Sequence, residues 1–530
     1  MDFFKKNKPI LFLSVFLIII IASFLRLYNL TVLPPGLYPD EAMNGNNALE
    51  ALSTNNFKIF YPENNGREGL FINIQAMSIH IFGNFSWVLR LISAIFGILT
   101  VLGVYFFTKE LFRDKNPAVP PENKKGLRAN EIIALLSSFF MAVSFWHINF
   151  SRIGFRAIMA PAFLVWAIYL LIKSLRQTKN NFQFSIFNFQ NWILEIRNWI
   201  LPAVAGLIYG LGFNSYIAYR ATPLLIGIIF FIFWRDAKRR GTQKIFYRLT
   251  AIFIAVSFLT ALPLGLYFLK NPADFFGRTT QISIFSSPNP VKSLVTNVIK
   301  TAGMFNVTGD GNWRHNYNSQ PELFWPVGIL FLIGIIIAVI KIFKKNKSQN
   351  PDTDYKIGPL ILFSWLVVTA LPVIVSNEGI PHALRAIIMI PPVFILAGLG
   401  TFKTYKFLYK YFTFKSLFKF NCFLFLALLF LQAYATYFIL WGKNPNTAGA
   451  FSQDYVDMAN QLKSLPPNIP KYIIVRASGT LVRGIPMPTQ TIMFLTDTFT
   501  PEKQKQKNIY YVLPDQAQNL PANSYKIILN

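Results

Sequence analysis

Two adjacent carboxylates, Asp40 and Glu41, lie in the stretch PPGLYPDEAMNG (34–45), which follows the first long apolar run. The prolines of this stretch restrict the backbone, so the two carboxylates are held in place. A carboxylate at a membrane surface can take a proton from a hydroxyl group or bind a metal ion. The same residues would also suit the N-cap of a helix over 42–52. The two interpretations are compatible if Glu41 caps the helix and Asp40 faces a cavity.

A second charged pair, Arg67 and Glu68, lies in NNGREGLF (64–71). It precedes the apolar stretch 69–83, which predicts a helix lying at the membrane interface. The pair could be a local ion pair, worth roughly 0–1 kcal/mol. Alternatively, it is a second charged element that faces Asp40 across the same loop.

Arginines precede four of the five apolar runs that we predict to begin on the outer side of the membrane, although the N-terminal end of a helix disfavours a cation by roughly 0.3–1 kcal/mol. A ring of guanidinium groups and helix N-termini is what a bound phosphate would select, whereas contact with lipid head groups would explain them as membrane anchors. The four are Arg90, Arg156, Arg220 and Arg385. The residues that we expect to bind a phosphate-bearing substrate are Arg67, Glu68, Arg152, Arg156, Arg220, His382 and Arg385.

The chain has four histidines and one cysteine, Cys422. One cysteine excludes an internal disulfide framework and a cysteine-rich metal site. His147 lies in an apolar run beside Trp146, which favours a hydrogen bond between helices. His315 could bind a metal, but the sequence shows no metal-ligand spacing, so a divalent metal stays an open alternative. The sequence also has no Gly-rich nucleotide loop, which argues against a nucleotide-sugar donor and an ATP-driven transporter.

The elements that must position these residues are apolar helices. Of the 530 residues, 53% are apolar and 14% are charged, whereas soluble domains carry about 25% charged residues. We therefore predict a polytopic α-helical membrane protein, because about 20 apolar residues cross a bilayer as a helix. The eleven predicted spans are 9–25, 91–108, 132–151, 157–172, 198–219, 221–234, 249–269, 323–340, 357–377, 386–402 and 420–442.

The net charge of +28 comes largely from basic residues in alternate loops between these runs. Lysine and arginine favour the cytoplasmic side of a membrane. We therefore expect a multi-pass plasma-membrane protein with a cytoplasmic N-terminus and with the loops 28–85 and 270–322 and the C-terminal tail outside. The loops assigned to the cytoplasm are 109–130, 173–197, 235–248, 341–356 and 403–419.

The composition changes after residue 442, which predicts a membrane domain over 1–442 and a small extracytoplasmic α/β domain over 443–530. Apolar residues at helical spacing predict a helix over 451–462. Four short runs read as strands: KYIIV, TIMFL, IYYVL and YKIIL.

Four stretches in order resemble the GT-C glycosyltransferases, and most closely the bacterial members of the dolichyl-phosphate-mannose–protein mannosyltransferase family. They are PPGLYPDEA, NNGREGLFI, FSRIGFRA and PHALRAIIMIPP, and the resemblance covers about residues 10–400. It implies inverting transfer of a sugar, mannose or another hexose or pentose, from a polyprenyl-phosphate donor to an extracytoplasmic protein, glycan or lipid. It further implies that Asp40 and Glu41 lie at the catalytic centre and that Arg156, Arg220 and Arg385 hold the donor phosphate. Some relatives bind a divalent metal in this cavity and others need none.

Two other classes of protein are compatible with the spans. A transporter or flippase of lipid-linked sugars would explain the arginines, but it would not need a proline-stiffened acidic pair. Transporters often show repeated halves, and the sequence shows none. A structural membrane subunit with a partner-binding tail would not explain the charged loops.

Overall fold

The computed structural model describes residues 2–113, 127–177, 189–281, 283–344 and 354–530. Each of the eleven predicted apolar runs falls on a helix. Nine helices of the described residues are long and apolar enough to cross a membrane; α5 and the described end of α8 are shorter apolar helices. The helices on these runs are α1 (Asp2–Leu27), α4 (Ser86–Leu111), α5 (Ala129–Ala142), α7 (Met159–Gln177), α8 (Phe189–Gly212), α9 (Thr222–Arg240), α10 (Gln243–Lys270), α13 (Trp325–Phe343), α14 (Asp354–Ile374), α15 (Ile390–Tyr411) and α16 (Lys415–Tyr434).

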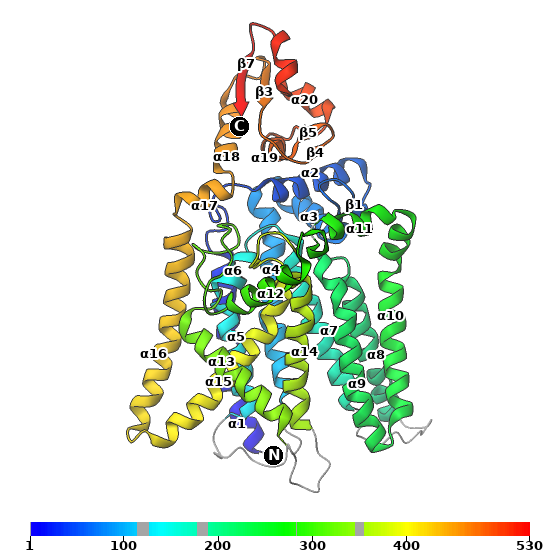
Figure 1. Cartoon of the computed structure of the whole chain (residues 1–530), viewed down its shortest axis with the longest axis vertical. Coiled ribbons are helices and arrows are strands. Elements are labelled where there is room, and N and C mark those ends of the chain that lie inside the picture. Colours follow the sequence, from blue (N-terminus) through cyan, green and yellow to red (C-terminus); the bar gives the residue numbers. More distant parts are fainter. Residues whose placement is uncertain (1, 114–126, 178–188, 282, 345–353) are drawn as a thin grey trace.

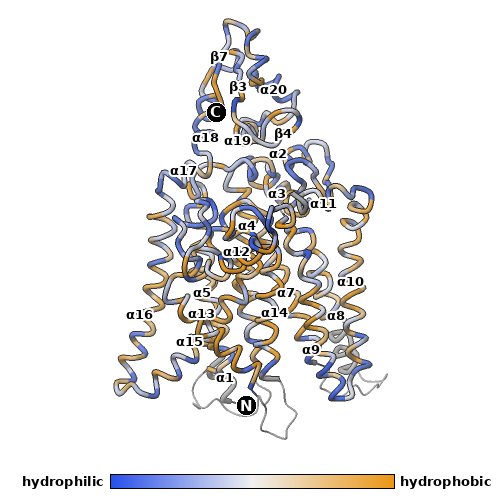
Figure 2. Tube along the Cα trace, viewed as in Figure 1, coloured by the Kyte–Doolittle hydropathy of each residue, from blue (hydrophilic) through white to orange (hydrophobic). Residues whose placement is uncertain are grey.

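The bundle is apolar along its helices, and the segment beyond α16 is more polar (Figure 2). Its core contains three fully buried tryptophans, Trp146, Trp365 and Trp441. The N-terminus lies at one end of the molecule and the C-terminal segment at the other (Figure 1). Parts of the predicted basic loops 109–130, 173–197 and 341–356 fall outside the described residues.

The loop after α1 forms a compact layer between the helix bundle and the C-terminal segment (Figure 1). It contains α2 (Pro39–Thr54), the antiparallel strands β1 (Phe60–Tyr61) and β2 (Arg67–Glu68), and α3 (Gly69–Phe82). The helix predicted over 69–83 is therefore present as α3.

Helix α2 begins three residues earlier than the sequence suggested, because Pro39 fits the first helical position. Its N-cap is Tyr38, which makes no side-chain capping bond. Asp40 and Glu41 therefore lie in the first turn, where carboxylates offset the helix dipole. The interpretation that Glu41 is the N-cap is wrong.

Between its spans the chain adds shorter elements. The stretch after α5 forms α6 (Phe145–Phe150), so the predicted span 132–151 is broken into two helices. The predicted loop 270–322 contains α11 (Pro272–Gln281) and α12 (Pro290–Gly303). Short 3-10 turns and one π-helical turn complete the bundle: η1 (Arg156–Ile158), η2 (Ile217–Ala221), η3 (Ile284–Ser286), η4 (Ile387–Met389) and the π-helical η5 (Ala435–Trp441).

The C-terminal segment contains a three-stranded parallel sheet in the order β6–β3–β7. Three of the four predicted strands and the predicted helix, now α18, are present. The elements are α17 (Pro445–Ala450), α18 (Gln453–Ser464), β3 (Lys471–Val475), β4 (Leu481–Val482), β5 (Ile485–Pro486), η6 (Met487–Thr489), α19 (Gln490–Thr496), α20 (Pro501–Lys507), β6 (Ile509–Val512), η7 (Pro514–Asn519) and β7 (Tyr525–Leu529).

The strand predicted at TIMFL (491–495) is wrong, because this run is the helix α19. Four of its five residues are buried, and a short buried apolar run has the same pattern in a strand as in a helix. Helix α19 packs against α2: a Cβ on Gly45 would meet the ring of Phe494 at 2.4 Å. The C-terminal segment is thus packed closely on the first loop.

Candidate active site

A cavity of about 120 Å³ opens beside the N-terminal turn of α2, and we call it the first-loop cavity. Its charged lining residues are Asp40, Arg67 and Arg156, which come from α2, β2 and η1. The sequence-predicted residues Asp40, Arg67 and Arg156 are thus brought together around one space. The full lining is Asp40, Asn44, Asn64, Gly66, Arg67, Phe155, Arg156, Ala157, Tyr216, Ile217 and Leu384.

Asp40 is half-buried and accepts a hydrogen bond from the Asn64 side-chain amide. Tyr38, two residues earlier, lies under the guanidinium of Arg314, which is 3.7 Å from the ring centroid. Burial and the neighbouring Asp40 charge raise the pKa of Tyr38 to about 12, so its hydroxyl stays protonated. Asp40 is the carboxylate that faces the cavity.

Glu41 points away from the cavity and is fully buried. Arg90 donates from Nε and Nη2 to its two carboxylate oxygens, at 3.0 and 3.1 Å. The amide of Gly154 donates to Glu41 Oε1 at 2.7 Å. Arg90 also donates to the carbonyls of Pro34 and Gly36. Glu41 and Arg90 therefore hold together α2, its entry loop and the segment before Arg156.

Arg67 and Glu68 do not pair with each other, because adjacent residues of a strand point to opposite faces. Arg67 is buried and donates to Asn44 Oδ1 at 2.8 Å and to Asn47 Oδ1 at 2.5 Å. Burial, together with the positive charge of Arg156, lowers the pKa of Arg67 to about 10. A bound anion would relieve this repulsion between the two guanidinium groups.

Glu68 accepts contacts from two arginines. Its Oε2 lies 2.7 Å from Arg156 Nε and its Oε1 lies 3.5 Å from Arg220 Nη2. The Arg220 guanidinium also packs over the rings of Phe268 and Phe275, at 4.9 and 4.4 Å. Glu68 thereby places Arg220 next to the cavity, although Arg220 does not line it.

The other predicted phosphate ligands lie elsewhere. Arg152 is fully buried and donates to the carbonyls of Leu25 and Leu33, at the junction of α1 with the first loop. Arg385 donates to Glu378 Oε2 at 2.9 Å and to the Ser376 hydroxyl. Neither residue lines the first-loop cavity.

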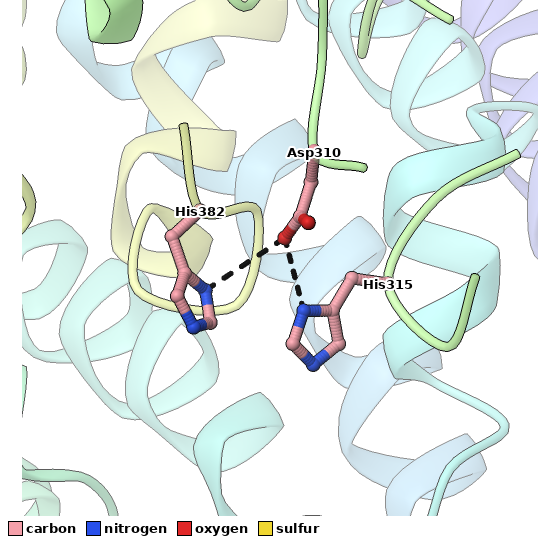
Figure 3. Close-up of side chains that lie close together, drawn as sticks. All are labelled: Asp310, His315 and His382. Atoms are coloured by element: carbon pink, nitrogen blue, oxygen red, sulfur yellow. Dashed lines mark hydrogen bonds and ion pairs between the residues drawn. The ribbon is translucent and has the colours of Figure 1, made fainter. Parts of the chain in front are cut away.

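His382 lies beside Asp310 and His315 (Figure 3). The sequence did not indicate Asp310 as a site residue, because two helices, α13 and α14, separate it along the chain from its neighbour His382. Among the residues that the structure describes, these three have donor atoms close enough together to hold a metal ion. His147 makes the predicted contact between helices: its Nδ1 lies 2.6 Å from Nη2 of the buried Arg26 in α1.

A chain of polar contacts connects the C-terminal segment to the cavity. Arg483 contacts Glu63 Oε1 at 2.9 Å and Glu50 Oε2 at 2.7 Å. Glu63 Oε2 accepts a hydrogen bond from Asn47 at 3.0 Å, and Asn47 Oδ1 accepts the bond from Arg67. A residue of the C-terminal segment thus contributes to the placement of a cavity residue.

No protein-family model and no curated protein sequence matches the chain. Solved structures are similar to it in fold. The apo oligosaccharyltransferase of Archaeoglobus fulgidus matches at 13% identity with a TM-score of 0.54, over 98% of this chain and 66% of that one. AglB from Archaeoglobus fulgidus, in complex with an inhibitory peptide and a dolichol-phosphate, matches at 14% identity with a TM-score of 0.53, over 92% of this chain and 64% of that one.

Apo ArnT from Cupriavidus metallidurans matches at 12% identity with a TM-score of 0.50, over 95% of this chain and 89% of that one. This chain thus spans about two thirds of the length of the archaeal enzymes and most of the length of ArnT. The chain therefore shares the fold of these archaeal oligosaccharyltransferases and of ArnT, in agreement with the membrane-protein fold that the four sequence stretches predicted.

Proposed function

We propose that this chain is an inverting glycosyltransferase that moves a sugar from a polyprenyl-phosphate donor to an acceptor hydroxyl. The observation that carries the proposal is the meeting of Asp40, Arg67 and Arg156 around the first-loop cavity, in a fold shared with glycosyltransferases. An archaeal enzyme of similar fold has been solved with a dolichol-phosphate and an inhibitory peptide. A lipid phosphate and an acceptor group are the two ligands that the proposal requires here.

The charges around the cavity favour an anionic ligand. Among the described lining residues, two guanidinium groups, those of Arg67 and Arg156, face one carboxylate, that of Asp40. Behind the lining, Glu68 contacts Arg156, and Arg220 contacts Glu68. Guanidinium groups bind phosphate through paired hydrogen bonds. In the proposal, the donor phosphate lies against Arg67 and Arg156, and Arg220 supports Arg156 through Glu68.

The chemistry assigns one role to each member of the acidic pair. Asp40 takes the proton of the acceptor hydroxyl as its oxygen attacks the anomeric carbon. The bond from that carbon to the phosphate oxygen breaks, and polyprenyl phosphate leaves as an anion. This leaving group needs no general acid, in contrast to the two carboxylates of a glycosidase. Glu41 acts through structure, by holding the turn that carries Asp40.

A divalent metal does not fit the lining of the first-loop cavity well. Asp40 is the one carboxylate among its lining residues, and Arg67 and Arg156 would repel a cation there. We therefore route no step through a metal at this cavity.

We propose further that the first-loop cavity opens on the extracytoplasmic side, and that residues 443–530 contribute to acceptor recognition from there. The basic residues of the alternate loops support this orientation. Labelling tests it: a single cysteine from Asn460→Cys, in a Cys422→Ser background, should react with an impermeant maleimide on intact cells. Labelling that requires permeabilised cells would reverse the assigned orientation.

The function is tested with the purified chain in proteoliposomes. A panel of polyprenyl-phosphate sugars is supplied with peptide, glycan and lipid acceptors, and products are identified by mass spectrometry. We expect a glycosylated acceptor and free polyprenyl phosphate from wild type, and far less of both in the same time from Asp40→Asn. Movement of the intact lipid-linked sugar between leaflets without any transfer would instead identify a flippase.

A further inference from the structure

Asp310, His315 and His382 form a compact cluster that is separate from the lining of the first-loop cavity. One donor atom of each residue lies within 4.8 Å of the other two. Asp310 Oδ2 is 2.9 Å from His315 Nδ1 and 3.8 Å from His382 Nδ1. Figure 3 shows that both imidazole rings turn a nitrogen toward this carboxylate oxygen.

Two imidazole nitrogens and one carboxylate oxygen are a donor set that zinc favours. Zinc bonds to such ligands are about 2.1 Å long, so the ligand atoms of a tetrahedral site lie roughly 3.4 Å apart. The two separations between Asp310 and the histidines, 2.9 and 3.8 Å, fall on either side of this value, and each differs from it by about half an ångström or less. We propose that the Asp310–His315–His382 cluster binds a divalent transition-metal ion of the zinc class.

The surroundings of Asp310 prepare it as a ligand. Asp310 and His315 are 4% and 5% exposed. Backbone hydrogen bonds hold the Asp310 carboxylate in place. The amides of Asn312 and Ala383 donate to its two oxygens at 2.8 and 2.9 Å. Such second contacts fix the direction of a ligating carboxylate.

A hydrogen-bonded Asp–His pair without a metal is the simpler alternative. It would account for the 2.9 Å contact between Asp310 and His315. It would not require the His382 ring, whose centroid lies 5.0 Å from that of His315, to approach the same oxygen. Convergence of two imidazoles from separate loops on one carboxylate oxygen favours a metal site.

The ion would join two segments, one of which contributes to the lining of the first-loop cavity. Asp310 and His315 belong to the loop between α12 and α13, and His382 belongs to the turn before η4. In the first segment, Arg314 covers the ring of Tyr38, next to Asp40. In the second, Leu384 lines the cavity. The ion would therefore fix the loop that covers Tyr38 relative to the segment that carries Leu384.

Metal binding is measured on the purified full chain after treatment with a chelator. Zn²⁺ content is determined by mass spectrometry after dialysis, and Co²⁺ is added as a probe because its visible absorption reports tetrahedral coordination. We expect about one Zn²⁺ per chain and at least a tenfold loss of affinity in His382→Ala. His80→Ala is the matched control, because His80 is exposed on α3, and it should bind like wild type.

Wild type that binds no stoichiometric Zn²⁺, or His382→Ala that binds as tightly as wild type, would overturn the proposal. If His382→Ala does not fold, melting of chelated wild type gives the answer. The Tm should rise with added Zn²⁺ and not with Mg²⁺, which prefers octahedral oxygen ligands. A Tm that does not respond to Zn²⁺ refutes the site. These readouts do not depend on sugar transfer, so the metal site and the proposed reaction can fail separately.

Discussion

The two carboxylate oxygens of Glu68 contact different arginines: Oε2 lies 2.7 Å from Arg156 Nε, and Oε1 lies 3.5 Å from Arg220 Nη2. The Glu68 side chain is 3% exposed, whereas each arginine is about one-fifth exposed. One buried carboxylate therefore holds two guanidinium groups side by side. Arg67 lines the first-loop cavity together with Arg156. Three guanidinium groups therefore lie near Glu68, and the single negative charge of Glu68 does not balance them.

Glu68→Gln should destabilise the protein, because it leaves two neighbouring cations without their shared carboxylate. We expect the free energy of unfolding to fall by roughly 3 kcal/mol, the lower end for a broken buried ion pair, since both arginines keep some solvent. Denaturant unfolding in detergent measures the change. Glu50→Gln is the control: its pair with Arg483 is more exposed and should contribute less than about 1 kcal/mol. Equal losses in both variants would contradict the shared-carboxylate role.

Arg156→Ala should impair use of the donor, because Arg156 lines the first-loop cavity and carries a charge suited to phosphate. We expect the donor KM to rise by about tenfold or more, with the acceptor KM nearly unchanged. Initial rates at varied donor concentration provide the measurement.

Arg385→Ala is the informative comparison for Arg156→Ala. The sequence-based proposal assigns Arg385 to the donor phosphate, but its side chain is occupied by Glu378 and Ser376. From the geometry we expect Arg385→Ala to lower the Tm and leave the donor KM unchanged. An equal rise of the donor KM in Arg156→Ala and Arg385→Ala would instead support a contact between Arg385 and the donor phosphate.

Asp40→Asn and Glu41→Gln should separate chemistry from structure. Asp40→Asn removes the proposed base and should lower kcat by about 10²–10⁴ with an unchanged Tm. Glu41→Gln breaks the buried contact with Arg90 and should cost roughly 3–5 kcal/mol of stability. Asp454→Asn, in the exposed first turn of α18, serves as a neutral control. If Asp40→Asn keeps wild-type activity, the assignment of Asp40 as base is wrong.

The architecture was predictable because each membrane span is encoded locally, as a run of apolar residues. The sequence places Asp40 and Arg67 in one loop between two spans and Arg156 at the start of another span. The pairing of Arg90 with Glu41 was not predictable, since it depends on how α4 packs against α2. The cluster around Asp310 was missed for the same reason: α13 and α14 separate it from His382 in sequence. The helices can therefore be predicted from local composition, whereas the contacts between charged groups depend on tertiary packing.

Glu322 should make stability depend on pH. Its side chain is buried, and burial raises its pKa well above the ordinary value. Between the unfolded and folded pKa values, the folded state binds more protons than the unfolded state, so stability falls as pH rises from about 4.3. The slope is at most about 1.4 kcal/mol per pH unit. Glu322→Gln should remove this dependence and be more stable than wild type at neutral pH, as judged by melting at pH 5 and pH 8. Parallel melting profiles for the two proteins would exclude this role for Glu322.

The contacts from Arg483 through Glu63 and Asn47 to Arg67 bear on how this protein could be re-engineered. The C-terminal segment therefore cannot be exchanged for an unrelated one without a change at this contact. A chimera that grafts a foreign C-terminal segment onto these membrane helices would leave Glu50 and Glu63 uncompensated, unless the graft supplies a cation at the position of Arg483. The graft would then alter the first-loop cavity from a distance, so compatible chimeras must be matched at this one arginine as well as at the junction.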